Sequence, residues 1–334
     1  MLNESSLRLL AALFFSLIAA LVLGPVLIPV LRRLKAGQTI RAEMSAAHQA
    51  KAGTPTMGGL LFLLPAAAAA LLFAPRTGEA NARLAIALAL MVGHGLVGFL
   101  DDYIKVVLKR SLGLRARDKL IAQVLLAALL AWGAGSYLQM GTGVTVPYFN
   151  WTFDYGPIVY FVLILLLVQG SANTVNFTDG VDGLLATVSI PVFLFWGLFI
   201  ALPKGQVELA VLALGLVGGC IGFLRYNWHP AKIFMGDVGS FGLGGALAAL
   251  AALTKTELLV PIAGGLFVIE GLSVIMQVLS FRLTGKRIFK IAPIHHHFEM
   301  VGWSERQIVQ NFTLLTLIFQ VLAFFALPGL VVGR

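Results

Sequence analysis

Charged residues are scarce in this sequence, and their scarcity is the first constraint on its class. Asp, Glu, Lys and Arg make up 12% of the 334 residues, whereas 59% are hydrophobic. A soluble domain carries about 25% charged residues, because polar side chains must cover its surface. With a mean hydropathy of +0.91, the sequence excludes an ordinary soluble protein and predicts a polytopic membrane protein.

Cysteine and acidic residues are also few. Cys220 is the single cysteine, so a disulfide within the chain is excluded, and its apolar surroundings indicate a small core residue. The 24 Lys and Arg against 15 Asp and Glu give a net charge of +9. The basic residues lie in loops between apolar runs, so they indicate membrane topology, and a second use in binding anionic phosphates stays open. No nucleic acid is expected as a partner.

Long apolar runs, in contrast, are abundant. A helix needs about 17–25 apolar residues to cross a bilayer. Ten segments of roughly this kind are found, at residues 7–31, 57–74, 82–100, 120–138, 157–172, 184–202, 207–224, 238–253, 258–281 and 308–327. Without a linker or clean repeat, they predict an all-α membrane protein with about ten transmembrane helices, forming a single domain over residues 1–334.

The distribution of charge predicts the orientation. Loops after odd-numbered spans hold eighteen Lys and Arg, and the opposite side holds six. Basic loops stay in the cytoplasm, so both termini are expected outside. Acids contribute little to orientation, yet six of them fall on the predicted cytoplasmic side and indicate a shared site there: Asp101, Asp102, Asp118, Asp179, Asp182 and Asp237.

The predicted outer segment 139–156 contains an alternating stretch, Gly-Thr-Gly-Val-Thr-Val-Pro-Tyr-Phe, which predicts a small hairpin. Its aromatic residues are expected to mark the membrane interface.

Three cytoplasmic stretches combine acids, lysines and glycines. Lys51 and Thr56 precede Gly58-Gly59 at a helix start; they suit a phosphate or head group, or a simple capped helix start, but not a P-loop. The pair Asp101-Asp102, which Lys105 and Lys119 follow, is a candidate for Mg²⁺ binding or general-base catalysis. The alternative interpretation is a solvated helix end that needs only some polar residue.

The segment 176–183 reads Asn-Phe-Thr-Asp-Gly-Val-Asp-Gly and includes Asn176, Asp179 and Asp182. It suits a cation or ligand site at a helix end, although these are also ordinary turn residues. A calcium loop is a weak match, because the downstream Glu of an EF-hand is missing. Asp237, between two glycines, repeats the same pattern, and Phe234 beside it suits base stacking or interfacial anchoring equally well.

Three consecutive histidines, His295, His296 and His297, lie in a further predicted cytoplasmic loop. Neighbouring side chains point in different directions, so the three histidines are not expected to share a metal. They are expected to contact phosphates or to position a substrate. Glu270 lies in a span and is costly there unless paired or hydrated, as in a cation-coupled transporter. The other acids lie at the membrane boundary, which disfavours transport.

Together these motifs, ending in Pro293-Ile-His-His-His-Phe-Glu299, resemble the phospho-N-acetylmuramoyl-pentapeptide transferase family, a branch of the polyprenyl-phosphate N-acetylhexosamine-1-phosphate transferases. The resemblance covers essentially the whole chain. It implies Mg²⁺-dependent transfer of phospho-MurNAc-pentapeptide from UDP-MurNAc-pentapeptide to undecaprenyl phosphate, giving lipid I and UMP at the cytoplasmic face of the bacterial inner membrane. The lipid bilayer and a homodimer are also implied, although no dimer interface can be read from periodicity.

The resemblance also implies residue roles. Asp237 is the expected Mg²⁺ ligand, and Asp101 or Asp102 would deprotonate or orient the acceptor phosphate. Catalytic roles extend to Lys119 and His295. Substrate binding is expected from Lys51, Thr56, Lys105, Asn176, Asp179, Asp182, Asn227, Phe234, His296 and His297. A direct and a two-step mechanism both stay open, as does a relative that uses UDP-GlcNAc.

Overall fold

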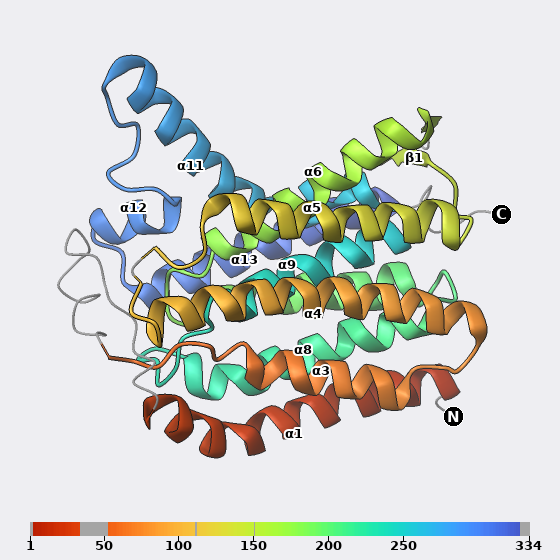
Figure 1. Ribbon diagram of the computed structural model, residues 1–334, viewed down its shortest axis with the longest axis horizontal. Coiled ribbons are helices and arrows are strands. Elements are labelled where there is room, and N and C mark those ends of the chain that lie inside the picture. Colours follow the sequence, from red (N-terminus) through yellow and green to blue (C-terminus); the bar gives the residue numbers. More distant parts are fainter. Residues whose placement is uncertain (1–2, 34–52, 111, 150, 328–334) are drawn as a thin grey trace.

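The computed structural model describes residues 3–33, 53–110, 112–149 and 151–327, which are mainly helical (Figure 1). Apolar runs form helices because backbone groups in a bilayer must be hydrogen-bonded internally. Nine helices of the described part are long and apolar enough to cross a membrane. They are α1 (Glu4–Arg33), α4 (Gly78–Val106), α5 (Ala116–Trp132) with η1 (Gly133–Tyr137), α6 (Gly156–Phe177), α7 (Leu184–Phe195) with η2 (Trp196–Ala201), α8 (Val207–Asn227), α9 (Gly236–Leu253), α11 (Gly265–Thr284) and α13 (Glu305–Phe325). The chain is therefore an all-α multi-pass membrane protein.

Two of the ten expected spans differ from the prediction. The second is the 14-residue helix α3 (Leu60–Phe73), which at about 1.5 Å per residue is shorter than the bilayer core of about 30 Å. The ninth is divided into η3 (Glu257–Leu259), α10 (Val260–Ala263) and α11. Pro261 lies at the start of α10 and Gly264 ends it, so apolar length alone overestimated the continuous helix.

The predicted hairpin is confirmed. Strands β1 (Gly143–Val146) and β2 (Trp151–Asp154) pair antiparallel, with Val144 opposite Phe153. The Tyr148 hydroxyl donates a hydrogen bond of 2.8 Å to the Leu322 carbonyl. The hairpin is thereby attached to the last turn of α13.

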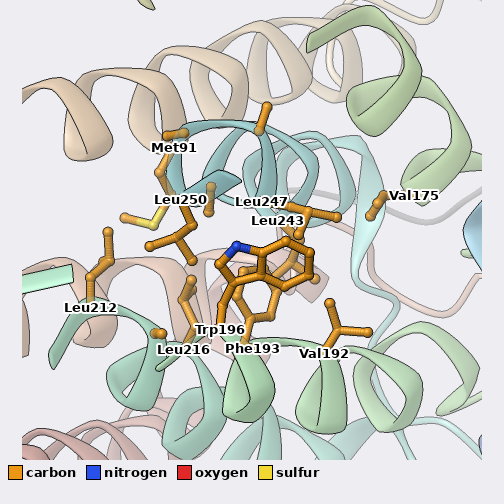
Figure 2. Close-up of a cluster of buried hydrophobic side chains, with 14 of the residues drawn as sticks. Met91, Val175, Val192, Phe193, Trp196, Leu212, Leu216, Leu243, Leu247 and Leu250 are labelled. Atoms are coloured by element: carbon orange, nitrogen blue, oxygen red, sulfur yellow. The ribbon is translucent and has the colours of Figure 1, made fainter. Parts of the chain in front are cut away.

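The core lies around α8 and α9, whose many glycines and alanines allow neighbouring helices to approach closely. Figure 2 shows Trp196 and Phe193 of the α7–η2 segment pointing toward Leu243 and Leu247 of α9. The buried Trp196 indole donates to the Thr256 hydroxyl, which satisfies its polar atom. Cys220 is buried, as expected.

The outer helices expose apolar side chains, including Ile18 on α1 and Ile318 on α13, as a lipid-facing surface requires. Helix α11 leans away from the bundle beside the short helix α12 (Ile294–Met300) (Figure 1). The start of α1 and the end of α13 lie at the same end of the bundle, opposite the end where α4 finishes and α9 begins.

Candidate active site

The acid pair Asp101-Asp102 lies near the end of α4 and is buried, with exposed fractions of 0% and 4%. Helix α4 packs against the start of α9 there. Gly98 makes the approach feasible, since a Cβ at that position would lie 2.1 Å from the Asp237 carbonyl oxygen. The sequence thus brings carboxylates 136 residues apart to one point through a glycine contact between two helices.

Asp237 is the second residue of α9 and the most connected acid of the site. Its Oδ2 lies 3.0 Å from Lys105 Nζ and 3.4 Å from Lys119 Nζ. Its Oδ1 accepts a 2.9 Å hydrogen bond from the Asn176 side chain. A carboxylate in the first turn of a helix is also favoured by the helix dipole.

Asp101 shares both lysines with Asp237. Its Oδ2 lies 2.5 Å from Lys105 Nζ and 3.0 Å from Lys119 Nζ, and its Oδ1 accepts a hydrogen bond from the Leu114 backbone. Lys119 Nζ additionally lies 5.3 Å from the centre of the Phe241 ring. Asp101 therefore fixes the two ammonium groups beside Asp237.

Asp102 and Thr56 surround Gly236 at the start of α9. The Asp102 Oδ2 accepts a hydrogen bond from the Val238 backbone. Gly236 has φ of +75°, and a Cβ there would lie 2.5 Å from Asp102 Oδ2 and 2.6 Å from Thr56 Oγ1. The Gly58 and Gly59 amides donate to the Phe234 and Met235 carbonyls. Two of the predicted stretches therefore meet through their backbones.

The three carboxylates fit a divalent cation. Asp101, Asp102 and Asp237 each offer an oxygen within 4.8 Å of the others. Oxygen ligands are those that Mg²⁺ prefers. With Lys105 and Lys119 as their neighbouring cations, three carboxylates and two ammonium groups leave a formal excess of one negative charge, which a bound cation would balance.

In the segment 176–183, two of the polar side chains face different partners. Burial, followed by the charge of Asp237, raises the pKa of Asp179 to about 7. Asp182 Oδ2 instead accepts from the Ala231 backbone and lies 3.1 Å from His229 Nδ1. With His229 and Glu305, Asp182 forms a second group of potential metal ligands.

The three histidines have three different surroundings. His295 is fully buried, and its Nδ1 lies 3.0 Å from the Glu270 carboxylate. His296 Nδ1 is hydrogen-bonded to Glu299, and His297 Nδ1 accepts from the Lys290 backbone. Three distinct partners agree with the expectation that they do not share one metal. Glu270 is paired, which meets the condition set for an acid in a span.

Three further predicted residues have different outcomes. Asn227 is buried and joins two segments, since its Oδ1 accepts from Gly183 and its Nδ2 donates to the Ile233 carbonyl. Phe234 is half-buried, and its amide donates to the Pro55 carbonyl. Lys51 lies outside the described residues, so its role stays a prediction.

Sequence reasoning missed residues that complete the arrangement. Ser240 accepts from Asn176 at 2.8 Å; its position one helical turn after Asp237 could have indicated it. Glu305 accepts from the Asp182 amide, across 123 residues, and no local pattern signals such a contact.

Comparison with known proteins identifies the class. Residues 84–255 match the model of glycosyl transferase family 4, and they include both Asp101-Asp102 and Asp237. The chain is thus a membrane-embedded transferase. Residues 51–63 also match phospho-N-acetylmuramoyl-pentapeptide-transferase signature 1, which covers the Thr56–Gly59 segment.

Similar proteins narrow the class further. A phospho-N-acetylmuramoyl-pentapeptide-transferase of Symbiobacterium thermophilum is 63% identical over 98% of both chains. Proteins of the same name from Desulforamulus reducens and Bacillus subtilis are 50% and 44% identical, covering 92% and 95% of this chain and 92% and 97% of their own. The chain belongs to the phospho-N-acetylmuramoyl-pentapeptide-transferase family.

Proposed function

We propose that this enzyme transfers phospho-MurNAc-pentapeptide from UDP-MurNAc-pentapeptide to undecaprenyl phosphate. The products are lipid I and UMP, in the first membrane step of peptidoglycan synthesis. The observation that carries the proposal is the convergence of Asp101, Asp102 and Asp237 with Lys105 and Lys119 in a chain of this family. Phosphoryl transfer between two anionic substrates depends on such charge compensation and positioning.

Asp237, with Asp101 and Asp102, would hold Mg²⁺, as the all-oxygen donor set supports. When bound, the cation supplies charge neutralisation at the transferred phosphoryl group and the leaving UMP. Asn176 and Ser240 hold Asp237 in place through the amide that bridges them. The metal ligand is thereby oriented before substrate arrives.

Lys105 and Lys119 would reduce the repulsion between the acceptor phosphate and the donor pyrophosphate. Both ammonium groups lie between Asp101 and Asp237, so they can turn toward a phosphate without leaving the site. Asp101 or Asp102 would orient or deprotonate the acceptor phosphate. Asp101 has both oxygens engaged, which favours a holding role and makes Asp102 the first candidate for the proton acceptor.

The nucleotide and sugar side would be formed by the loops around this centre. The segment 176–183 supplies Asp179 and Asp182, and Phe234 would stack on uracil. The remaining contacts with the substrate would come from Lys51, Thr56, Asn176, Asn227, His296 and His297. His295, which also has an expected catalytic role, is fully buried and would act on the site indirectly.

The same reasoning assigns location. The excess of basic residues in loops on the site's side supports a cytoplasmic active site in the bacterial inner membrane. A lipid acceptor and a soluble nucleotide sugar can meet only at such a surface. Helices from both halves of the chain supply the site, which supports one catalytic domain over residues 1–334; a homodimer stays a prediction.

The test is a radiolabel transfer assay with the purified chain, UDP-MurNAc-pentapeptide, undecaprenyl phosphate and Mg²⁺. A labelled lipid product and released UMP are expected. Turnover of UDP-GlcNAc in place of the muramoyl donor would reassign the chain to another sugar. Trapping a phosphorylated carboxylate with the donor alone would indicate the two-step route.

A further inference from the structure

Glu270 is an acid buried inside a membrane-spanning helix, and its surroundings are specific. It belongs to α11 and has an exposed fraction of 0%. Its Oε1 lies 3.0 Å from Nδ1 of His295, which is equally buried. An apolar residue would be cheaper at this depth, so helix packing alone does not account for a glutamate.

The contact determines the proton position on the imidazole. When Glu270 is ionised, its carboxylate only accepts hydrogen bonds, and the Nδ1 of His295 then carries the hydrogen. Its other nitrogen, Nε2, is buried and makes no hydrogen bond within the described residues. A carboxylate behind an imidazole fixes ring orientation and tautomer in this way at many functional sites.

The free nitrogen lies against the loop that precedes α7. A Cβ added to Gly180 would lie 2.1 Å from His295 Nε2 and 3.0 Å from His296 Nε2. Gly180 therefore provides the surface on which both imidazoles rest. Asp179 precedes it in the chain and Asp182 follows two residues later, so a shift of the imidazoles would be passed to the backbone that carries both carboxylates.

We propose that Glu270 is a positioning residue that acts through His295 on the segment 176–183. It holds the ring with Nδ1 protonated and seated on Gly180, and so keeps Asp179 and Asp182 in place for the nucleotide half of the donor substrate. The inference rests on the proposed function for the identity of that ligand. The Glu270–His295–Gly180 contact itself does not depend on it.

The first experiment separates the two substrates. Glu270→Gln retains size but no longer enforces one tautomer, because an amide can donate as well as accept. We expect the KM for UDP-MurNAc-pentapeptide to rise about tenfold and the KM for undecaprenyl phosphate to stay unchanged. The control is Glu208→Gln, another buried glutamate, paired with Arg83 at the opposite end of the bundle; its donor KM should match wild type even if its thermal stability falls.

The second experiment tests the contact by complementation. Gly180→Ala places a methyl group where His295 Nε2 lies, so it should lower thermal stability and raise the donor KM. In the His295→Ala background there is room for the methyl group, so Gly180→Ala should cost less stability there than in wild type, and this difference measures the recovery. In the His295→Ala background, Glu270→Gln should raise the donor KM no further.

Three results would overturn the proposal: an unchanged donor KM in Glu270→Gln, additive effects of Glu270→Gln and His295→Ala, or no recovery of stability in the Gly180→Ala, His295→Ala pair. The stability cycle needs no substrate. Recovery in that cycle, together with no lipid product from wild type, would therefore reject the proposed function and keep the contact.

Discussion

Asp237 contacts both lysines of the candidate site, and it lies beside the other two carboxylates of the proposed metal site. Removing its charge leaves Lys105 and Lys119 with Asp101 alone and removes one of three potential metal ligands. The formal excess of one negative charge that a bound cation would balance then disappears, and the cation loses affinity.

Asp237→Asn should therefore lower turnover about a hundredfold or more, since several kcal/mol of charge stabilisation are lost. Asn retains the volume, so the protein should remain folded. Transfer assays over a range of Mg²⁺ concentrations provide the measurement. Asp154→Asn, in the hairpin at the other end of the bundle, should keep normal turnover; activity close to wild type in Asp237→Asn would remove it from the metal site.

Asp179 makes a pH-dependent contribution to stability. Its pKa in the folded protein is raised from 3.8 to about 7 by burial and the charge of Asp237, so the folded state holds the proton more tightly than the unfolded state. The group therefore contributes its whole stabilisation of the folded state at pH values below 3.8. This contribution is lost as the pH rises through about 7.

The Asp179→Asn variant should consequently gain unfolding temperature relative to wild type as the pH rises toward about 7, and the difference should level off above it. Thermal unfolding of the purified protein across this range measures the difference. Hydrogen bonds from Thr142 and Gly156 lower the pKa of Asp154, so its contribution is lost only at acidic pH, and the same comparison for Asp154→Asn should stay flat above about pH 5. A flat profile for Asp179→Asn as well would show that Asp179 ionises normally.

Residue types and loop positions were sufficient to predict much of the candidate site. The sequence predicted a shared site from the charged residues that collect at one membrane boundary. The structure brings four of them together: Asp101, Asp102, Asp237 and Lys105. The sequence could not indicate which partner each side chain would choose. Glu270 was recognised as needing a partner, but His295 lies 25 residues away and is brought to it only by the fold of the chain after α11.

At the scale of elements, the contact between α4 and α9 positions the acids. Gly98 allows it, because a Cβ there would lie 2.1 Å from the Asp237 carbonyl oxygen and 2.6 Å from the Val238 nitrogen. Gly98→Ala should push the start of α9 away from Asp101 and Asp102. We expect at least a tenfold loss of turnover and a stability loss of about 1–3 kcal/mol from overpacking.

Gly78→Ala is the matched control for that substitution. Gly78 begins the same helix, and an added Cβ there meets nothing within 4 Å. Activity assays and thermal unfolding of the two variants should therefore separate the effect of helix contact from that of helix propensity. Equal behaviour of both variants would mean that the α4–α9 contact tolerates a methyl group and does not set the acid positions.

Helix existence was more predictable than helix ends. Apolar length identifies a span because the bilayer core has a fixed thickness, and each predicted segment contains helix in the structure. The short length of α3 and the break at Gly264 were not predicted, because apolar residues continue across both boundaries. Such boundaries depend on packing and on backbone conformation, and hydrophobicity alone does not report either of them.

At the scale of the whole molecule, the orientation in the membrane follows from charge asymmetry alone. Loops on the side of the candidate site carry most of the Lys and Arg, so that side should face the cytoplasm and the β1–β2 hairpin should face out. Cysteine labelling of the wild-type protein should be low, because Cys220 is its single cysteine and is buried.

Single cysteines at two exposed positions can test that orientation in living cells. Phe149→Cys lies in the hairpin turn, and Ile288→Cys lies in the loop after α11; the native side chains are 61% and 55% exposed. A membrane-impermeant maleimide should label Phe149→Cys in intact spheroplasts and Ile288→Cys only after the membrane is permeabilised, while wild type stays unlabelled in both. The reverse pattern would place the carboxylate cluster outside the cell, away from a cytoplasmic nucleotide sugar, and would contradict the proposed reaction as well as the orientation.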